Sequence, residues 1–198
     1  MLNRRCFVLR CEMLVEAQLA DVFRVFENPY NLARITPPWL NFQVVTPELE
    51  MRRGALIDYT IRWMGLPMSW RTLISEYEAP RAFVDEQLKG PYTVWRHLHT
   101  FEETADGTRI GDQVRYVLPL GPLGRAAHAV MVERQLKGIF RFRQRALAPL
   151  LGDVVAMPDP TVERAQTTEF DVAIPRTGRV GTASRGSHTP VGSYSATR

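Results

Sequence analysis

Several motifs that would mark a nucleotide-driven enzyme or a serine hydrolase are missing from this sequence. It has no glycine-rich phosphate loop between a strand and a helix, and no Gly-x-Ser-x-Gly nucleophile elbow. Long hydrophobic runs are missing too, because Arg10 and Glu12 interrupt the apolar stretch that follows Asn3-Arg4-Arg5. That stretch is too short for a signal peptide or a membrane span. We therefore expect no secretion signal and no transmembrane segment.

Cysteine is scarce, with two in 198 residues. Cys6 and Cys11 are five positions apart on the first predicted strand, and an odd separation places their side chains on opposite faces. That geometry disfavours a disulfide between them. We therefore expect reduced thiols and a cytoplasmic protein.

Acidic residues are absent from residues 176–198, which contain four arginines. Subtracting these four from the 25 basic residues of the chain leaves 21, equal to its 21 acidic residues. The formal net charge of +4 therefore belongs to this segment, and the neutral body argues against nucleic acid as a partner. The segment is rich in Gly, Ser and Thr and poor in apolar residues, so we expect it to be disordered.

The rest of the chain has the size of one folded domain. The sequence is 45% hydrophobic, and a body of about 150 residues can bury roughly 70% of its unfolded surface. We assign a ligand-binding domain to residues 1–152 and an extension to residues 153–198, disordered from about residue 176.

Hydrophobic periodicity predicts a first strand over residues 5–15 and a helix over residues 19–26. A second short helix ends near Thr36-Pro37-Pro38, because successive prolines remove backbone donors and restrict the residue before each. Further strands are predicted at about residues 42–47, 54–64, 68–77, 82–89, 92–103 and 108–118. One long helix with an apolar stripe then extends to about Leu151.

The last two predicted strands form a hairpin with one aromatic face. Asp106-Gly107 is a favoured two-residue turn. Counting outward from this turn pairs Phe101 with Asp112, His99 with Val114, His97 with Tyr116 and Trp95 with Leu118. These residues alternate along both strands with a mostly hydrophilic set, and this alternation is typical of an antiparallel sheet folded over a core or a ligand.

A second hairpin is predicted at Gly65-Leu66. Counting outward from it pairs Trp63 with Met68, Ile61 with Trp70, Tyr59 with Thr72 and Ile57 with Ile74, and again one face is apolar. The strand over residues 82–89 cannot be oriented in this way, because Lys89-Gly90-Pro91-Tyr92 closes with either two or three loop residues. One choice turns Asp85 and Gln87 inward, and the other turns Val84, Glu86 and Leu88 inward.

A strand, two short helices, six strands and a long terminal helix follow the order of the helix-grip fold. Over about residues 5–151 the chain resembles the ligand-binding branch of the SRPBCC superfamily, which includes START-type lipid-transfer domains, pathogenesis-related plant allergens and polyketide cyclases. The segments that carry the resemblance are Asn31-Leu32-Ala33-Arg34-Ile35-Thr36-Pro37-Pro38, Phe83-Val84-Asp85-Glu86-Gln87 with Lys89-Gly90-Pro91-Tyr92, and Trp95-Arg96-His97-Leu98-His99-Thr100-Phe101.

The resemblance implies an α+β helix-grip fold, in which a curved antiparallel sheet of about seven strands wraps around the long C-terminal helix. Two short helices follow the first strand. A hydrophobic cavity is implied between sheet and helix, but its occupant is not, because a fold alone does not give a function.

The predicted inner face supplies the candidate ligand-binding residues, of which the aromatic ones exceed what a thin core requires. The set is Tyr59, Trp63, Trp70, Trp95, His97, His99, Phe101, Asp112, Tyr116 and Arg143. Arg143 interrupts the apolar stripe of the long helix. It can snorkel to solvent, pair with an inner carboxylate such as Asp112 or hold an anionic ligand head, and we favour snorkelling.

Metal binding and acid–base catalysis compete with simple binding at this face. His97 and His99 have the spacing of two metal ligands, but only His128 remains in the body to complete a set, so we predict no metal and no cofactor. His97 beside Tyr116, and His99 near Asp112, could orient a proton donor for enol or carbonyl chemistry. These groups could instead satisfy one another's hydrogen bonds inside a cavity, which we favour.

We predict that the protein binds a small, largely apolar molecule, such as a lipid, an isoprenoid or quinone, or a polyketide-like compound. The alternative is a polyketide cyclase, aromatase or dehydratase that uses His97, His99, Asp112 and Tyr116 as acid and base. A third reading, a partner of another protein or a transient membrane contact, rests only on the basic face of the long helix. The oligomeric state is left open.

Overall fold

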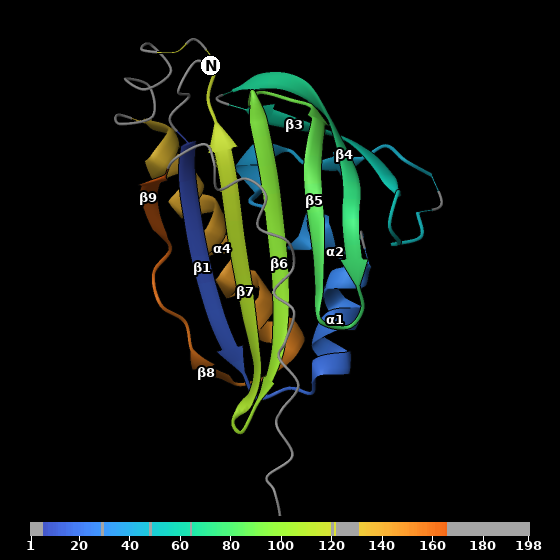
Figure 1. Cartoon of the computed structure of the whole chain (residues 1–198), viewed down its shortest axis with the longest axis vertical. Coiled ribbons are helices and arrows are strands. Elements are labelled where there is room, and N and C mark those ends of the chain that lie inside the picture. The colour runs from blue at the N-terminus through green and yellow to red at the C-terminus, as the bar shows by residue number, and fades with distance from the viewer. Residues whose placement is uncertain are drawn as a thin grey trace, which may run out of the picture.

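A computed structural model describes residues 6–165 of the chain, except residues 29, 48, 64, 120 and 122–130 (Figure 1). In this part, nine strands form one sheet in the order β2-β3-β4-β5-β6-β7-β1-β8, with β9 also paired to β1. The strands are β1 Cys6–Val15, β2 Gln43–Val44, β3 Leu56–Trp63, β4 Leu66–Glu78, β5 Ala82–Lys89, β6 Val94–Thr104, β7 Gly107–Val117, β8 Val154–Ala156 and β9 Thr161–Ala165. The helices are α1 Leu19–Glu27, α2 Asn31–Arg34, the 3-10 turn η1 Pro38–Leu40 and α4 Glu133–Leu151.

The helices lie on one side of the curved sheet, with α4 running behind β1 and β7 (Figure 1). Helix α1 buries Val22, Phe23 and Phe26, three positions that share one helical face. The inward face of α4 is mostly apolar as well, and includes the buried Leu136 and Phe140. The predicted helix-grip α+β fold is thereby confirmed, with more strands than the seven expected.

The β6–β7 hairpin has the predicted faces but not the predicted pairs. Its turn is Ala105-Asp106, so that Thr104 pairs with Gly107, and His99 lies opposite Asp112 rather than Val114. Gly107 follows the turn with a φ of 122°, a conformation that glycine adopts without strain. The predicted register was therefore wrong by two residues, and an even shift leaves every side chain on its face.

The β3–β4 hairpin differs from its prediction in the same way. Trp63 pairs with Leu66, and Tyr59 lies opposite Trp70 rather than Thr72. Gly65 has a φ of 82°, which glycine adopts without strain, and it directly precedes Leu66, which belongs to β4 and not to the turn as predicted. Here too the shift is two residues, so Tyr59, Ile61 and Trp70 keep the inner face.

Strand β5, whose face the sequence left open, is fixed by its pairing with β6. Asp85 lies opposite His97, and Phe83 lies opposite His99. The Gln87 side chain spans the connecting loop, because its Nε2 donates to the Tyr92 carbonyl at 2.7 Å while its Oε1 accepts from the Tyr92 N–H at 3.3 Å. Asp85 therefore belongs to the inner face.

The segment after α4 is part of the sheet. Residues Cys6–Arg10 of β1 pair with β9, and Leu14 and Val15 pair with β8. The extension predicted from residue 153 is thus packed on the domain as far as Ala165. The predicted disorder of residues 176–198 falls outside the described residues and stays a prediction, as does any role of His128.

No disulfide joins Cys6 and Cys11, which are both buried and belong to different apolar clusters. Within the described ranges, no helix has the length and hydropathy needed to cross a bilayer.

Candidate functional site

A cavity of about 170 Å³ lies between the concave face of the sheet and helices α1 and α4. Six of the predicted ligand-binding residues line it, namely Tyr59, Trp70, Trp95, His97, His99 and Arg143. Apolar side chains complete most of the wall, among them Ile57, Ile61, Leu136, Ile139 and Phe140. The side chain of Trp63 lies outside the described part of the structure.

Three predicted ligand-binding residues are not in the cavity wall. Phe101 packs against Phe23 and Phe26, with ring centroids 5.4 and 4.9 Å away, and these three residues form what we term the phenylalanine cluster. Tyr116 is fully buried and stacks on Phe7 at 5.6 Å. Because β7 pairs two residues away from the predicted register, Tyr116 lies opposite Trp95 and not beside His97. Asp112, the third, lies behind the histidines.

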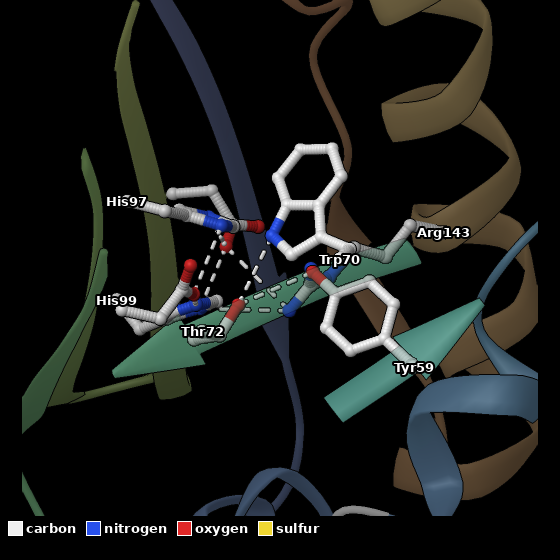
Figure 2. Close-up of polar contacts among 8 residues, drawn as sticks. Tyr59, Trp70, Thr72, His97, His99 and Arg143 are labelled. Carbon is white, nitrogen blue, oxygen red and sulfur yellow. Dashed lines mark hydrogen bonds and ion pairs between the residues drawn. The ribbon is translucent and has the colours of Figure 1, made fainter. Parts of the chain in front are cut away.

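The polar end of the cavity is formed by two imidazoles, tilted 35° to each other, that lie between two carboxylates (Figure 2). The rings of His97 and His99 are 3.8 Å apart between centroids. Asp112 Oδ1 lies 2.9 Å from His97 Nε2 and 3.0 Å from His99 Nδ1. On the other side, Asp85 Oδ2 lies 2.9 Å from His99 Nε2 and 3.4 Å from His97 Nδ1. Each carboxylate therefore faces one nitrogen of each ring.

Arg143 of α4 joins this group, so the favoured prediction that it snorkels to solvent was wrong. It is 9% exposed, and its Nη2 lies 3.7 Å from Asp112 Oδ1 and 3.5 Å from His99 Nδ1. Its guanidinium also lies over the rings of Phe26 and Phe140, at 5.3 and 5.9 Å. We call Asp85, His97, His99, Asp112 and Arg143 the charged cluster.

The charges of this cluster nearly balance. Two carboxylates and one guanidinium leave one negative charge, which one proton shared by the two imidazoles would neutralise. Burial lowers the pKa of His97, and the adjacent His99 lowers it further. Although burial opposes it, Arg143 and the hydrogen bonds of the histidines hold the pKa of Asp112 well below its ordinary value. The pKa of Asp85 is lowered by the same histidines against the effect of its burial.

Sequence reasoning missed two members of the site. Asp85 was one of two alternatives, because the length of the β5–β6 loop was ambiguous. Thr72 was assigned no role, yet its hydroxyl accepts from Trp70 Nε1 at 3.1 Å and lies 3.3 Å from the Tyr59 hydroxyl (Figure 2). A hydroxyl between two ring partners on adjacent strands carries no signal in the sequence.

The cavity therefore has mostly apolar walls and a polar end at the charged cluster. The imidazoles can donate to or accept from an oxygen atom of a ligand, and their carboxylates fix the ring orientation. The buried Nε–H of Arg143 has no hydrogen-bond partner in the described part of the structure, so it can donate to one more acceptor.

A family model described as polyketide cyclase / dehydrase and lipid transport matches residues 15–141 of the chain. The sequence of this chain matches no curated protein.

Solved structures of the same fold include protein CV1439 from Chromobacterium violaceum, with a TM-score of 0.57 and 15% identity over 74% of this chain and 99% of that one. Major latex-like protein 151 from Panax ginseng has a TM-score of 0.54 and 11% identity, covering 72% of this chain and 95% of that one. The di-domain ARO/CYC StfQ of the steffimycin biosynthetic pathway has a TM-score of 0.52 and 12% identity, covering 71% of this chain and 50% of that one. At these identities the likeness concerns the fold.

Proposed function

The chain belongs to the polyketide cyclase / dehydrase and lipid transport family, and from this membership we propose that its cavity binds a compact, largely apolar molecule with one oxygen-bearing end. The observation that carries the proposal is the cavity itself, with mostly apolar walls and a polar end where His97, His99, Asp85 and Arg143 of the charged cluster line it. Such a division is typical of pockets in which apolar area gives affinity and a few polar groups give orientation.

The size of the cavity supports a ring-shaped ligand over a long chain. Its 170 Å³ is comparable with the engineered apolar cavity of about 150 Å³ that admits benzene. Drug-sized ligands usually occupy about 300–1,000 Å³, so a lipid or a polyisoprenoid quinone would require the walls to move. A planar aromatic or polyketide-like ring suits the volume and the surrounding tryptophan and tyrosine rings.

The proposal is tested with 1-naphthol, a fused aromatic ring with one hydroxyl, by titration monitored through tryptophan fluorescence or calorimetry. Trp95→Ala removes a large ring from the wall, and apolar burial is worth about 25 cal/mol per Å². We expect affinity to fall at least tenfold. His97→Gln removes about one net hydrogen bond, worth about 1 kcal/mol, and should cost less.

Trp39→Ala is the matched control. Trp39 is 57% exposed and packs on Phe142, and it does not line the cavity. Its variant should bind 1-naphthol like the parent protein. No binding by the parent, or equal losses in the Trp39 and Trp95 variants, would contradict the proposal. Native mass spectrometry of protein purified from its own cells would reveal a co-purified ligand.

A second candidate function is acid–base catalysis of a cyclase, aromatase or dehydratase type. The observation that favours it is that His97 and His99 face the cavity while each is held by carboxylates. Tyr116, which does not reach the cavity, takes no part in it. If a substrate is converted, His97→Gln or His99→Gln should abolish turnover with binding nearly intact, whereas a pure carrier shows no turnover to lose.

The burial of Cys6 and Cys11 in separate apolar clusters, with no disulfide between them, supports a reducing compartment, the cytoplasm, as the place of action.

A further inference from the structure

The two imidazoles direct one nitrogen each toward the same point on the cavity side of the charged cluster. His97 Nδ1 and His99 Nε2 both approach Asp85 Oδ2, at 3.4 and 2.9 Å (Figure 2). One donor atom from each of these three residues can be chosen so that all lie within 4.8 Å of one another. Bonds of about 2.0–2.2 Å from these atoms to a shared ion need only small side-chain rotations.

The opposite nitrogens of both rings are held from behind by Asp112. Its Oδ1 lies 2.9 Å from His97 Nε2 and 3.0 Å from His99 Nδ1, and it faces protein rather than the cavity. Arg143 Nη2, which lies 3.5 Å from His99 Nδ1, can only donate, so a bound ion would require His99 Nδ1 to turn its proton to Asp112 and Arg143 to contact that carboxylate alone. With both nitrogens donating to Asp112, the two rings are neutral and their remaining lone pairs point toward Asp85. Metal-binding histidines almost always have this arrangement, in which the second ring N–H donates to a carboxylate or carbonyl. Arg143 partly neutralises Asp112 from α4.

On the Asp85 side, two nitrogen lone pairs and a carboxylate oxygen would then face one another. Three acceptors in contact repel unless a cation lies between them. A proton can serve, as in the charge balance described above, but one proton cannot bridge three acceptors equally. An ion with several coordination positions can.

We propose that Asp85, His97 and His99 form a binding site for a divalent first-row transition metal ion, oriented by Asp112 and open to the cavity. Two imidazoles and one carboxylate form a donor set suited to Zn²⁺, Co²⁺ or Fe²⁺, and leave coordination positions for a ligand. From the sequence we predicted no metal, because only His128 was found to complete a set with His97 and His99. Asp85 did not enter that set, since the orientation of its strand was undecided.

The charge of the loaded site indicates what such an ion would bind in the cavity. A divalent ion with Asp85, Asp112 and Arg143 leaves one net positive charge, against none when the imidazoles share one proton. A ligand with one anionic oxygen, such as a phenolate, an enolate or a carboxylate, would restore neutrality. The metal site itself does not depend on the identity of the cavity ligand, and it is measured separately from 1-naphthol binding.

The direct test uses the full-length protein stripped with EDTA, titrated with Zn²⁺ and observed through the imidazole ¹⁵N resonances. The chain has four histidines, so the signals are few. We expect one equivalent of Zn²⁺ to bind, with His97 coordinating through Nδ1 and His99 through Nε2. Because this measurement needs no substitution, it stays decisive if a variant fails to fold. Absence of stoichiometric binding, or coordination through the opposite nitrogens, would overturn the proposal.

Variants provide the second test, with Co²⁺ absorption as the readout and circular dichroism as the check on folding. Asp85→Asn should weaken Co²⁺ binding at least tenfold, and Asp112→Asn about 10–100-fold, the usual cost of losing a carboxylate behind a ligand. Glu86→Gln is the matched control, since Glu86 is the next residue on β5 and bonds Ser75 and Arg96 instead. Unchanged Co²⁺ binding in a folded Asp85→Asn protein would overturn the assignment.

Discussion

Strand β6 contributes to two buried regions, one stabilised by apolar contacts and the other by ion pairs and hydrogen bonds. Phe101 belongs to the phenylalanine cluster between β6 and α1. There the energy of each contact is small and undirected, and another apolar contact can replace it. His97 and His99, a few residues earlier, belong to the charged cluster, where each group depends on a particular partner. Burial is similar in the two regions, but tolerance to change is not, because an unpaired buried charge costs far more than a small void.

The largest expected difference comes from Asp112→Asn, a substitution that hardly changes shape. It removes the charge that both imidazoles and Arg143 contact, and breaking a buried ion pair from one side costs about 3–5 kcal/mol. Because asparagine keeps one acceptor oxygen, we expect the unfolding free energy to fall by about 3 kcal/mol. Urea denaturation with EDTA present measures it.

The neighbouring Gln113→Ala serves as a control for that substitution. Gln113 lies on the other face of β7, where it contacts the exposed Arg10, and its loss should change stability by no more than about 0.5 kcal/mol. A similar small change for Asp112→Asn would show that the charged cluster does not contribute to stability as proposed.

A smaller effect is expected from acid, and of the two regions compared only the charged cluster contains groups that titrate. Because burial lowers the pKa of His97, the folded protein prefers the neutral ring. This contribution is present above the unfolded pKa of about 6.5 and is lost as pH falls toward the folded value. One proton changes stability by at most about 1.4 kcal/mol per pH unit. A further loss should begin below about pH 4, where Asp85 and Asp112, with lowered pKa values, start to require protonation.

Melting temperatures measured from pH 7.5 to 4 with a chelator present test this pH dependence. In the His97→Gln protein the decline between about pH 6.5 and 5 should be absent. Stability that rises as pH falls through this interval would mean that the folded state prefers the charged ring.

The smallest effect is expected from Ile110→Val, in the apolar region. Ile110 lies opposite Phe101 and two residues before Asp112 on the same face of β7. Removing one methyl group from a packed core costs about 0.5–1.5 kcal/mol. In urea denaturation, Ile110→Val should therefore lower the unfolding free energy clearly less than Asp112→Asn does. The reverse order would invalidate the comparison of the two regions.

The two regions also differ in how far they could be predicted from sequence. Inner and outer faces at both hairpins followed from a period of two and survived an error in register, because moving each turn by one residue shifts the strand pairing by two. The partners within the charged cluster did not survive it. Asp112 moved from opposite Phe101 to opposite His99, and Tyr116 left the neighbourhood of His97.

Arg143 shows a second limit of prediction. On a helical wheel, an arginine within an apolar stripe can reach solvent or turn inward, and we favoured the first because long charged side chains usually keep their heads in water. The choice depends on whether a carboxylate from a distant strand lies within reach, and Asp112 does. A tertiary neighbour of this kind is set by the curvature of the sheet and the path of α4, which no local pattern encodes.

The pairing of β8 and β9 with β1 has a consequence for solution behaviour. Strand β1 carries Phe7, Val8, Leu9 and other apolar residues, and its free side would otherwise present a row of unpaired N–H and C=O groups. Exposed edges of this kind template strand addition between molecules. The short strands after α4 thus protect the domain against aggregation, and a protein shortened at residue 152 should self-associate through β1.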